Sequence, residues 1–201
     1  MIAVVDYGVG NLFSLASSLR FLGLDCLVTN KTDELLRAER IILPGVGAFG
    51  DAMAKLIETG LVGTIKELSA EKPLLGICLG MQLLFEKSFE HGETEGLGLI
   101  PGTVEPLAGD IPPDLKVPHM GWNRLEIARE DPIFKYFQSG EWVYYVHGYY
   151  AKCAQENILG VSEYGVTVTG LVRSGLVYGA QFHPEKSGDA GLRILKAFSE
   201  L

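Results

Sequence analysis

Short apolar runs alternate with amphipathic stretches through the first half of the chain. Residues 2–5 are all apolar, and after a glycine-containing turn apolar side chains recur at helical spacing from Leu12 to Leu22, where Gly23 ends the pattern. Two more strand-like runs at 26–29 and 41–43 follow, then helical stretches at 49–58 and 61–70, and another apolar run just before Cys78. This alternation predicts a parallel sheet covered by helices on both faces.

The pattern changes from about residue 104. Four segments with strand composition, 142–146, 158–163, 166–173 and 176–182, follow one another with little helix between them, and helical spacing returns only at 189–201, with Ser187 or Asp189 available as a cap. The Gly- and Pro-rich segment 92–118 is expected to be the most mobile surface. We therefore predict a single α/β domain, 1–201, with three layers: a mostly parallel central sheet flanked by helices, and an added antiparallel segment in the second half.

Composition narrows the classes of function. The 201 residues are 47% hydrophobic and 21% charged, which is enough apolar material for one core, and the net charge of −8 with 17 scattered Lys and Arg argues against nucleic-acid binding. We expect no membrane segment, because no apolar run approaches the length of about 18 residues that spanning requires. Three cysteines without metal-type spacing indicate a cytoplasmic protein, and we expect neither a metal nor another cofactor.

Cys78 lies at a sharp junction between an apolar run and a helical stretch. The sequence Gly76-Ile-Cys78-Leu-Gly-Met-Gln82 places it in a Gly-x-Cys-x-Gly pattern, in which the two glycines permit a tight bend. The N–H groups that begin the helix would favour a thiolate and could bind an oxyanion. A cysteine taken alone is more often a buried structural thiol, but this setting favours a nucleophile.

His183 is the best candidate for the base that such a thiol needs. Pro184 biases His183 toward an extended conformation, in which residues two apart share a face, so that Glu185 can orient the imidazole. Taken singly, His183 could be a strand-end histidine bonded to a carbonyl, and Glu185 a solvated carboxylate. The three residues together predict a catalytic triad of Cys78, His183 and Glu185.

The other cysteines and two of the other histidines have no such setting. We expect Cys26 and Cys153 to be structural, His91 to be exposed in an acidic loop, and His147 to be packed within an aromatic strand.

Two glycine turns follow other predicted strands. In Pro44-Gly-Val-Gly47 the glycines would let backbone N–H groups approach a ligand, as an oxyanion hole requires, although a plain tight turn is the alternative. Gly8-Val-Gly10 suggests a dinucleotide fingerprint, but Phe13 stands where the third glycine belongs. The sequence therefore disfavours nucleotide binding.

The motifs Gly76–Gln82 and Gln181-Phe-His-Pro-Glu185 together resemble the class I, triad-type glutamine amidotransferases, and the resemblance covers essentially the whole chain. Further segments resemble the branch of that family that supplies ammonia to a cyclase of histidine biosynthesis. Met81 also favours this branch, because many relatives in anthranilate, carbamoyl phosphate or GMP synthesis carry histidine there. The further segments are Asp6-Tyr-Gly-x-Gly-Asn11, Pro44–Gly47, Pro118-His-Met-Gly-Trp-Asn123 and Tyr145-Val-His147.

The resemblance implies hydrolysis of L-glutamine to glutamate and ammonia. Cys78 would attack the side-chain amide as a thiolate, His183 would pass the thiol proton to the departing ammonia, and Glu185 would hold the imidazole. The resemblance also assigns an oxyanion hole to backbone groups at Gly45, Val46 and Leu79, and substrate binding to Gly47 and Gln82.

We further hypothesise that the isolated chain is nearly inactive because the turn at Val46 presents a carbonyl to the oxyanion, and that partner binding rotates this peptide. The flanking glycines make such a rotation inexpensive.

A single helix follows Glu185, so the acceptor of the ammonia is expected on another chain. In the family this is a (β/α)8-barrel cyclase subunit, which forms a heterodimer with the glutaminase and makes imidazole glycerol phosphate and AICAR. By itself Trp122 fits a core position and an interface anchor equally well. The resemblance assigns the partner interface to Asn11, His119, Met120, Trp122, Asn123 and Lys186.

Three other functions stay open on the sequence alone. A glutaminase that serves pyridoxal phosphate synthesis would dock differently, and the segment Pro118–Asn123 argues against it. A catalytically silent binding module is disfavoured by the intact triad, whereas a cysteine hydrolase of esters or peptides is disfavoured only by the family resemblance. Release of ammonia from glutamine would discriminate among these classes.

Overall fold

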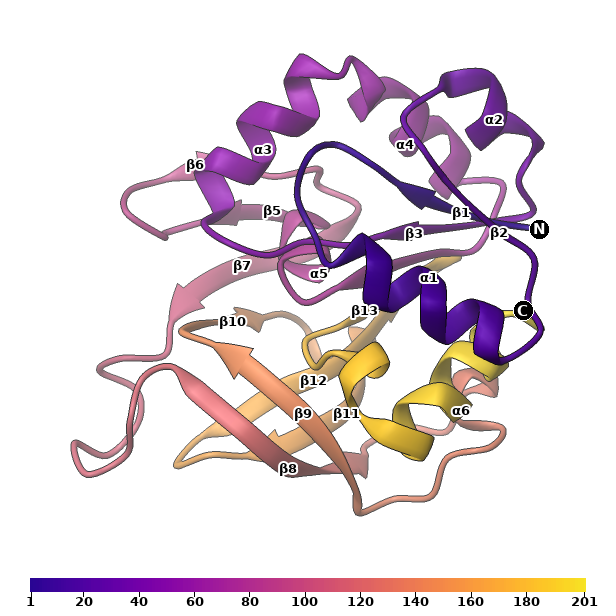
Figure 1. Cartoon of the computed structure of the whole chain (residues 1–201). Coiled ribbons are helices and arrows are strands. Elements are labelled where there is room, and N and C mark those ends of the chain that lie inside the picture. The colour runs from indigo at the N-terminus through magenta and orange to yellow at the C-terminus, as the bar shows by residue number, and fades with distance from the viewer.

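A nine-stranded mixed sheet runs through the whole molecule in the computed structural model, which describes all 201 residues (Figure 1). Neighbouring strands are parallel from β2 to β13, and each strand after β13 is antiparallel to its neighbour. In spatial order the strands are β2 (Cys26–Thr29), β1 (Ile2–Val5), β3 (Arg40–Leu43), β4 (Leu74–Ile77), β13 (Val177–Ala180), β12 (Thr167–Ser174), β11 (Ile158–Glu163), β8 (His119–Ile127) and β9 (Glu141–His147). The predicted α/β class, with an antiparallel segment in the second half, is confirmed.

A second sheet of four strands lies beside the first. Its strands are, in order, β10 (Tyr149–Lys152), β7 (Ile100–Pro106), β5 (Phe85–Ser88) and β6 (Thr94–Glu95). Much of the Gly- and Pro-rich segment 92–118, expected to be mobile surface, is exposed, including residues 108–110, 112–114 and 116–118. The same segment also contributes β6, β7 and the fully buried side chains of Ile100 and Val104, because apolar positions lie between its glycines and prolines.

Helices cover both faces of the large sheet, as the alternating pattern predicted (Figure 1). On one side lie α2 (Thr32–Arg37), α3 (Phe49–Glu58) and α4 (Leu61–Ser69), and on the other lie α1 (Leu12–Phe21) and α6 (Gly188–Phe198). Successive residues of β1 point to opposite sides, so that Ala3 and Val5 belong to one apolar core and Ile2 and Val4 to the other. None of the helices combines the length and the apolar character needed to cross a membrane.

The strand order fixes where chemistry can occur. Because β1, β3, β4 and β13 are adjacent and parallel, the residues that follow their carboxyl ends meet at one edge of the sheet. These residues are the glycine turn after β1, the turn Pro44–Gly47 after β3, Cys78 after β4 and Gln181 after β13. The segments singled out in the sequence therefore converge in space.

Candidate active site

Cys78 joins β4 to the short helix α5 (Leu79–Leu83) in a strained conformation. Its φ of 55° and ψ of −112° are rare for a residue with a side chain and cost on the order of 1–3 kcal/mol, which tertiary packing must offset. The sequence pattern attributed the bend to the flanking glycines, but the positive φ lies at Cys78 itself. Gly76 and Gly80 instead allow close approach: a Cβ at Gly76 would lie 2.6 Å from the Gly80 carbonyl oxygen, and one at Gly80 would overlap the carbonyl of Leu43.

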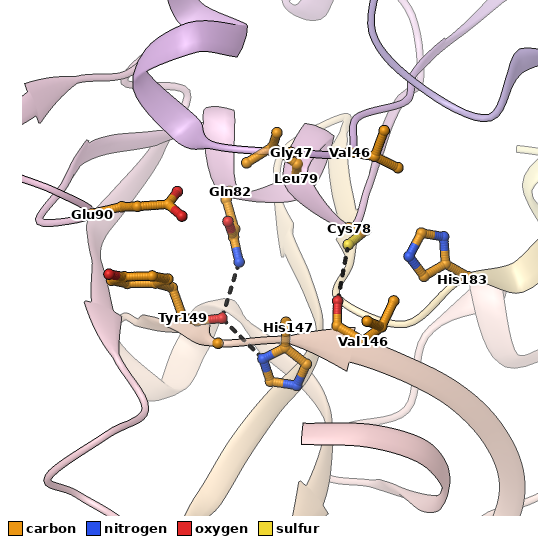
Figure 2. Close-up of a pocket in the computed structure, with 11 residues that line it drawn as sticks. Val46, Gly47, Cys78, Leu79, Gln82, Glu90, Val146, His147, Tyr149 and His183 are labelled. Atoms are coloured by element: carbon orange, nitrogen blue, oxygen red, sulfur yellow. Dashed lines mark hydrogen bonds between the residues drawn. The ribbon is translucent and has the colours of Figure 1, made fainter. Parts of the chain in front are cut away.

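A pocket of about 200 Å³ opens at Cys78 (Figure 2). It brings together Cys78, His183 and four of the five residues predicted for oxyanion and substrate binding, whereas Cys26 and Cys153 lie outside it. The residues that line it are Val46, Gly47, Cys78, Leu79, Gln82, Glu90, Val146, His147, Gly148, Tyr149 and His183. Cys78 is 7% exposed, so it is buried in the fold but lines this pocket.

His183 faces Cys78 across the pocket with one ring nitrogen free (Figure 2). Its Nδ1 lies 2.9 Å from Glu185 Oε1, and its buried Nε2 has no hydrogen-bond partner in the chain. Burial acts to lower the pKa of His183, but the neighbouring Cys78 and Glu185 outweigh burial and raise the pKa to about 9. Cys78 and Glu185 on its two sides thus favour the protonated form of the imidazole.

The pairing of His183 with Glu185 arises from a turn. His183 is extended, with φ −97° and ψ 98°, but Pro184–Lys186 forms a 3₁₀ turn, so the expected continuous extended segment was wrong. Of the two residues expected to cap α6, Ser187 and Asp189, Ser187 occupies the cap position, but its side chain makes no cap hydrogen bond. Its hydroxyl instead donates to the His183 carbonyl at 2.7 Å and accepts from the Tyr144 N–H at 2.9 Å. This residue fixes the backbone of His183 against β9.

The turn Pro44–Gly47 packs directly on the elbow, the bend at Cys78 between β4 and α5. A Cβ at Gly45 would lie 2.6 Å from the Gly80 nitrogen, so only glycine permits this contact. The buried Tyr7 hydroxyl donates to the Pro44 carbonyl at 2.7 Å and anchors the start of the turn. Val46, which is 41% exposed, and Gly47, with φ +97°, complete the turn at the pocket edge.

Gln82 and Glu90 form the pocket wall away from His183. The Gln82 Nε2 group donates to the Tyr149 carbonyl at 3.0 Å and to Gln181 Oε1 at 3.1 Å, and no group in the chain bonds its Oε1. Glu90 accepts the Phe49 N–H on Oε2 at 2.7 Å. Sequence reasoning missed Glu90 because no motif marks it, and only the turn between β5 and β6 brings it to the pocket.

The residues expected at a partner surface differ in exposure. Met120 and Trp122 are 62% and 53% exposed on β8, so the alternative that Trp122 is a core residue was wrong. Lys186 is exposed, and Asn11 and Asn123 are partly exposed. His119, in contrast, is 3% exposed beneath this surface, where it offers little area to a partner.

Comparisons with known proteins identify a family and relatives that the chain matches. The family model described as glutamine amidotransferase class-I matches residues 3–200. The imidazole glycerol phosphate synthase subunit HisH of Listeria monocytogenes (serovar 1/2a) is 52% identical over all of this chain and 96% of its own length, and that of Bacillus cereus (strain B4264) is 52% identical over 98% and 93%.

Solved structures share the fold. The structure of PurLQS from Thermotoga maritima matches with a TM-score of 0.76 and 23% identity, over 99% of this chain and 97% of that chain. A crystal structure of a glutamine amidotransferase matches with a TM-score of 0.75 and 19% identity, over 99% and 100%.

Proposed function

Because the chain belongs to the class I glutamine amidotransferase family, we propose that its pocket hydrolyses L-glutamine through Cys78, His183 and Glu185, and that the ammonia passes to a cyclase subunit. The chain is a glutamine amidotransferase whose relatives are the HisH subunits of imidazole glycerol phosphate synthase. One observation carries the assignment of the residues. The thiol of Cys78, on a strained bend, shares a pocket with the imidazole of His183, whose Nδ1 is hydrogen-bonded to the buried carboxylate of Glu185.

The geometry supports each step of amide hydrolysis. The Cys78 thiolate attacks the side-chain amide carbon. The resulting oxyanion accepts hydrogen bonds from the backbone N–H groups of Leu79 and of the turn at Gly45 and Val46. The imidazolium of His183 gives its proton to the departing nitrogen, so ammonia leaves and a glutamyl thioester remains. Neutral His183 then takes a proton from water, which attacks the thioester and releases glutamate and the Cys78 thiolate.

Polar groups on the opposite wall suit the amino-acid end of glutamine. The free Gln82 Oε1 and the Glu90 carboxylate can accept the α-ammonium group, and the backbone at Gly47 can meet the α-carboxylate. An ester or a peptide without these charged ends would leave Gln82 Oε1 without a partner and the Glu90 carboxylate without a countercharge, which favours free glutamine over other carbonyl substrates.

The exposed surface of β8 supports docking of a (β/α)8-barrel cyclase as a heterodimer. Met120 pairs with Val146 of β9, which lines the pocket, so the exposed side chains of Met120 and Trp122 lie one strand from the chemistry. Asn11, Asn123 and Lys186 would supply polar contacts at this interface, with His119 supporting it from below. Three free cysteines suit a cytoplasmic location.

Steady-state ammonia release from glutamine, with and without the cyclase, tests this proposal. We expect strong activity only in the complex, because of the peptide rotation at Val46, and we expect Cys78→Ala to lose at least about three orders of magnitude in kcat. The matched variant Cys26→Ala, outside the pocket, should keep wild-type turnover. Unchanged turnover in Cys78→Ala would refute the nucleophile, and full activity of the lone chain would refute the rotation.

A further inference from the structure

We propose that His119 and His147 are positioning residues for glutamine hydrolysis, which hold the Tyr149 carbonyl and the Gln82 amide at the pocket wall through an oriented chain of hydrogen bonds. This inference rests on the proposed function and assigns a role to two buried histidines that the triad does not use.

The acceptors in the chain fix the direction of each bond. The Tyr149 carbonyl only accepts, so His147 Nδ1, at 2.9 Å, carries a proton. In a neutral ring His147 Nε2 is then an acceptor, and His119 Nδ1, at 3.0 Å, donates to it. His119 Nε2 in turn accepts from Asn123 Nδ2 at 3.3 Å.

Burial keeps both rings neutral, as this direction requires. Burial lowers the pKa of His119 to about 4, and burial together with the neighbouring His119 lowers the pKa of His147 to about 3. The same direction places both rings in the Nδ1–H tautomer. His119 is also clamped between the rings of Tyr145 and Tyr164, whose centroids lie 4.8 and 4.0 Å away.

The chain of hydrogen bonds ends at groups that line or adjoin the proposed catalytic pocket. The Tyr149 carbonyl accepts from His147 on one side and from Gln82 Nε2 on the other, so both of its lone pairs are used (Figure 2). The second hydrogen of that Gln82 amide reaches Gln181 Oε1, and Gln181 Nε2 lies 4.0 Å from Cys78 Sγ. This arrangement fixes Gln82 with its Oε1 free for substrate.

Nitrogen-15 NMR of the histidine rings in the full chain at pH 7 tests the orientation directly. We expect His119 and His147 both to show a protonated Nδ1 and an unprotonated Nε2. An Nε2–H tautomer at either ring would overturn the assigned direction of the hydrogen bonds, and this measurement does not depend on activity.

The functional part is tested by His119→Phe, which keeps a ring between Tyr145 and Tyr164 but removes the donor to His147. At saturating cyclase we expect kcat/KM for glutamine to fall by about tenfold or more, because misplacement near the reacting groups is costly. His119→Asn keeps a donor close to the Nδ1 position and should recover kcat/KM to within about threefold of wild type.

Tyr164→Phe is the matched control, since it keeps the stacked ring and removes only a hydroxyl that donates to the Lys116 carbonyl. A folded His119→Phe with kcat/KM within about twofold of wild type, or an equal loss in Tyr164→Phe, would overturn the positioning role. If His119→Phe does not fold, the NMR result and the His119→Asn kinetics decide. Loss of activity in Cys78→Ala with no effect in His119→Phe would leave the proposed function intact and refute this inference alone.

Discussion

The two nitrogens of His183 face different surroundings, and this difference governs its protonation. Nδ1 is held by the Glu185 carboxylate, while Nε2 is free toward Cys78. The pKa of about 9 lies above the ordinary value of 6.5, so the charged ring stabilises the folded chain fully below pH 6.5, and this contribution is lost as the pH rises through about 9. The proton needed by the departing ammonia is lost over the same range.

We predict that kcat/KM for glutamine, measured in the complex, declines on the alkaline side near pH 9 in the wild type. In Glu185→Gln the decline should move to lower pH, because burial still disfavours the imidazolium while the carboxylate that stabilises it is gone. Glu67→Gln, an exposed carboxylate on α4, serves as the control and should leave the profile unchanged. An alkaline limb that does not move in Glu185→Gln would contradict the role of this carboxylate.

At the scale of elements, the contact between α5 and the end of β3 sets the geometry of the elbow. The backbone of α5 at Gly80 lies against the Leu43 carbonyl with no room for a side chain. The same approach brings Leu79 beside Gly45 of the oxyanion turn. A helix displaced from β3 would therefore separate the two halves of the proposed oxyanion hole.

Two helical glycines provide a matched test of this packing. Gly80→Ala should destabilise the chain by about 1–3 kcal/mol through overpacking and reduce glutaminase activity. Gly63→Ala, in α4 with open space around it, should stabilise by about 0.5–1 kcal/mol through helix propensity. Denaturant unfolding measures both free energies. A Gly80→Ala variant as stable as the wild type would show that this contact does not constrain the elbow.

At the scale of the whole molecule, the two halves of the large sheet contribute different parts of the site. The parallel half brings Cys78, the proposed nucleophile, and the turn Pro44–Gly47 to one edge. The antiparallel half supplies β9, which lines the pocket, and β8, which carries the exposed Met120 and Trp122 (Figure 1). The proposed partner surface thus belongs to the same continuous sheet as the site.

We predict that Trp122→Ala weakens cyclase binding by about 2 kcal/mol, or roughly thirtyfold in Kd, as loss of an aromatic anchor does. The free energy of unfolding should change by less than about 0.5 kcal/mol, since the side chain is half exposed. Leu36→Ala is the control: Leu36 is 53% exposed on α2, outside the residues that line the pocket at Cys78, and should leave Kd unchanged. Titration calorimetry with the cyclase measures Kd for both variants. Equal Kd values for Trp122→Ala and wild type would refute the anchor.

Sequence alone determined the elements whose signal is local. Apolar periodicity predicted α3 at its observed bounds, and the Gly-x-Cys-x-Gly pattern identified Cys78 as the junction between β4 and α5. His183 and Glu185 were paired correctly, although through a 3₁₀ turn and not an extended segment. The short helix α2 escaped prediction because Leu35 is its only buried residue.

Only the tertiary structure decided the contacts between distant segments. Glu90 reaches the pocket through a hairpin of the second sheet, and His119 meets His147 through the pairing of β8 with β9. Strand order and register depend on packing summed over the whole core, and no local pattern encodes that sum. The sequence thus pointed to the groups that we propose carry the chemistry, whereas the fold set their distances and their burial.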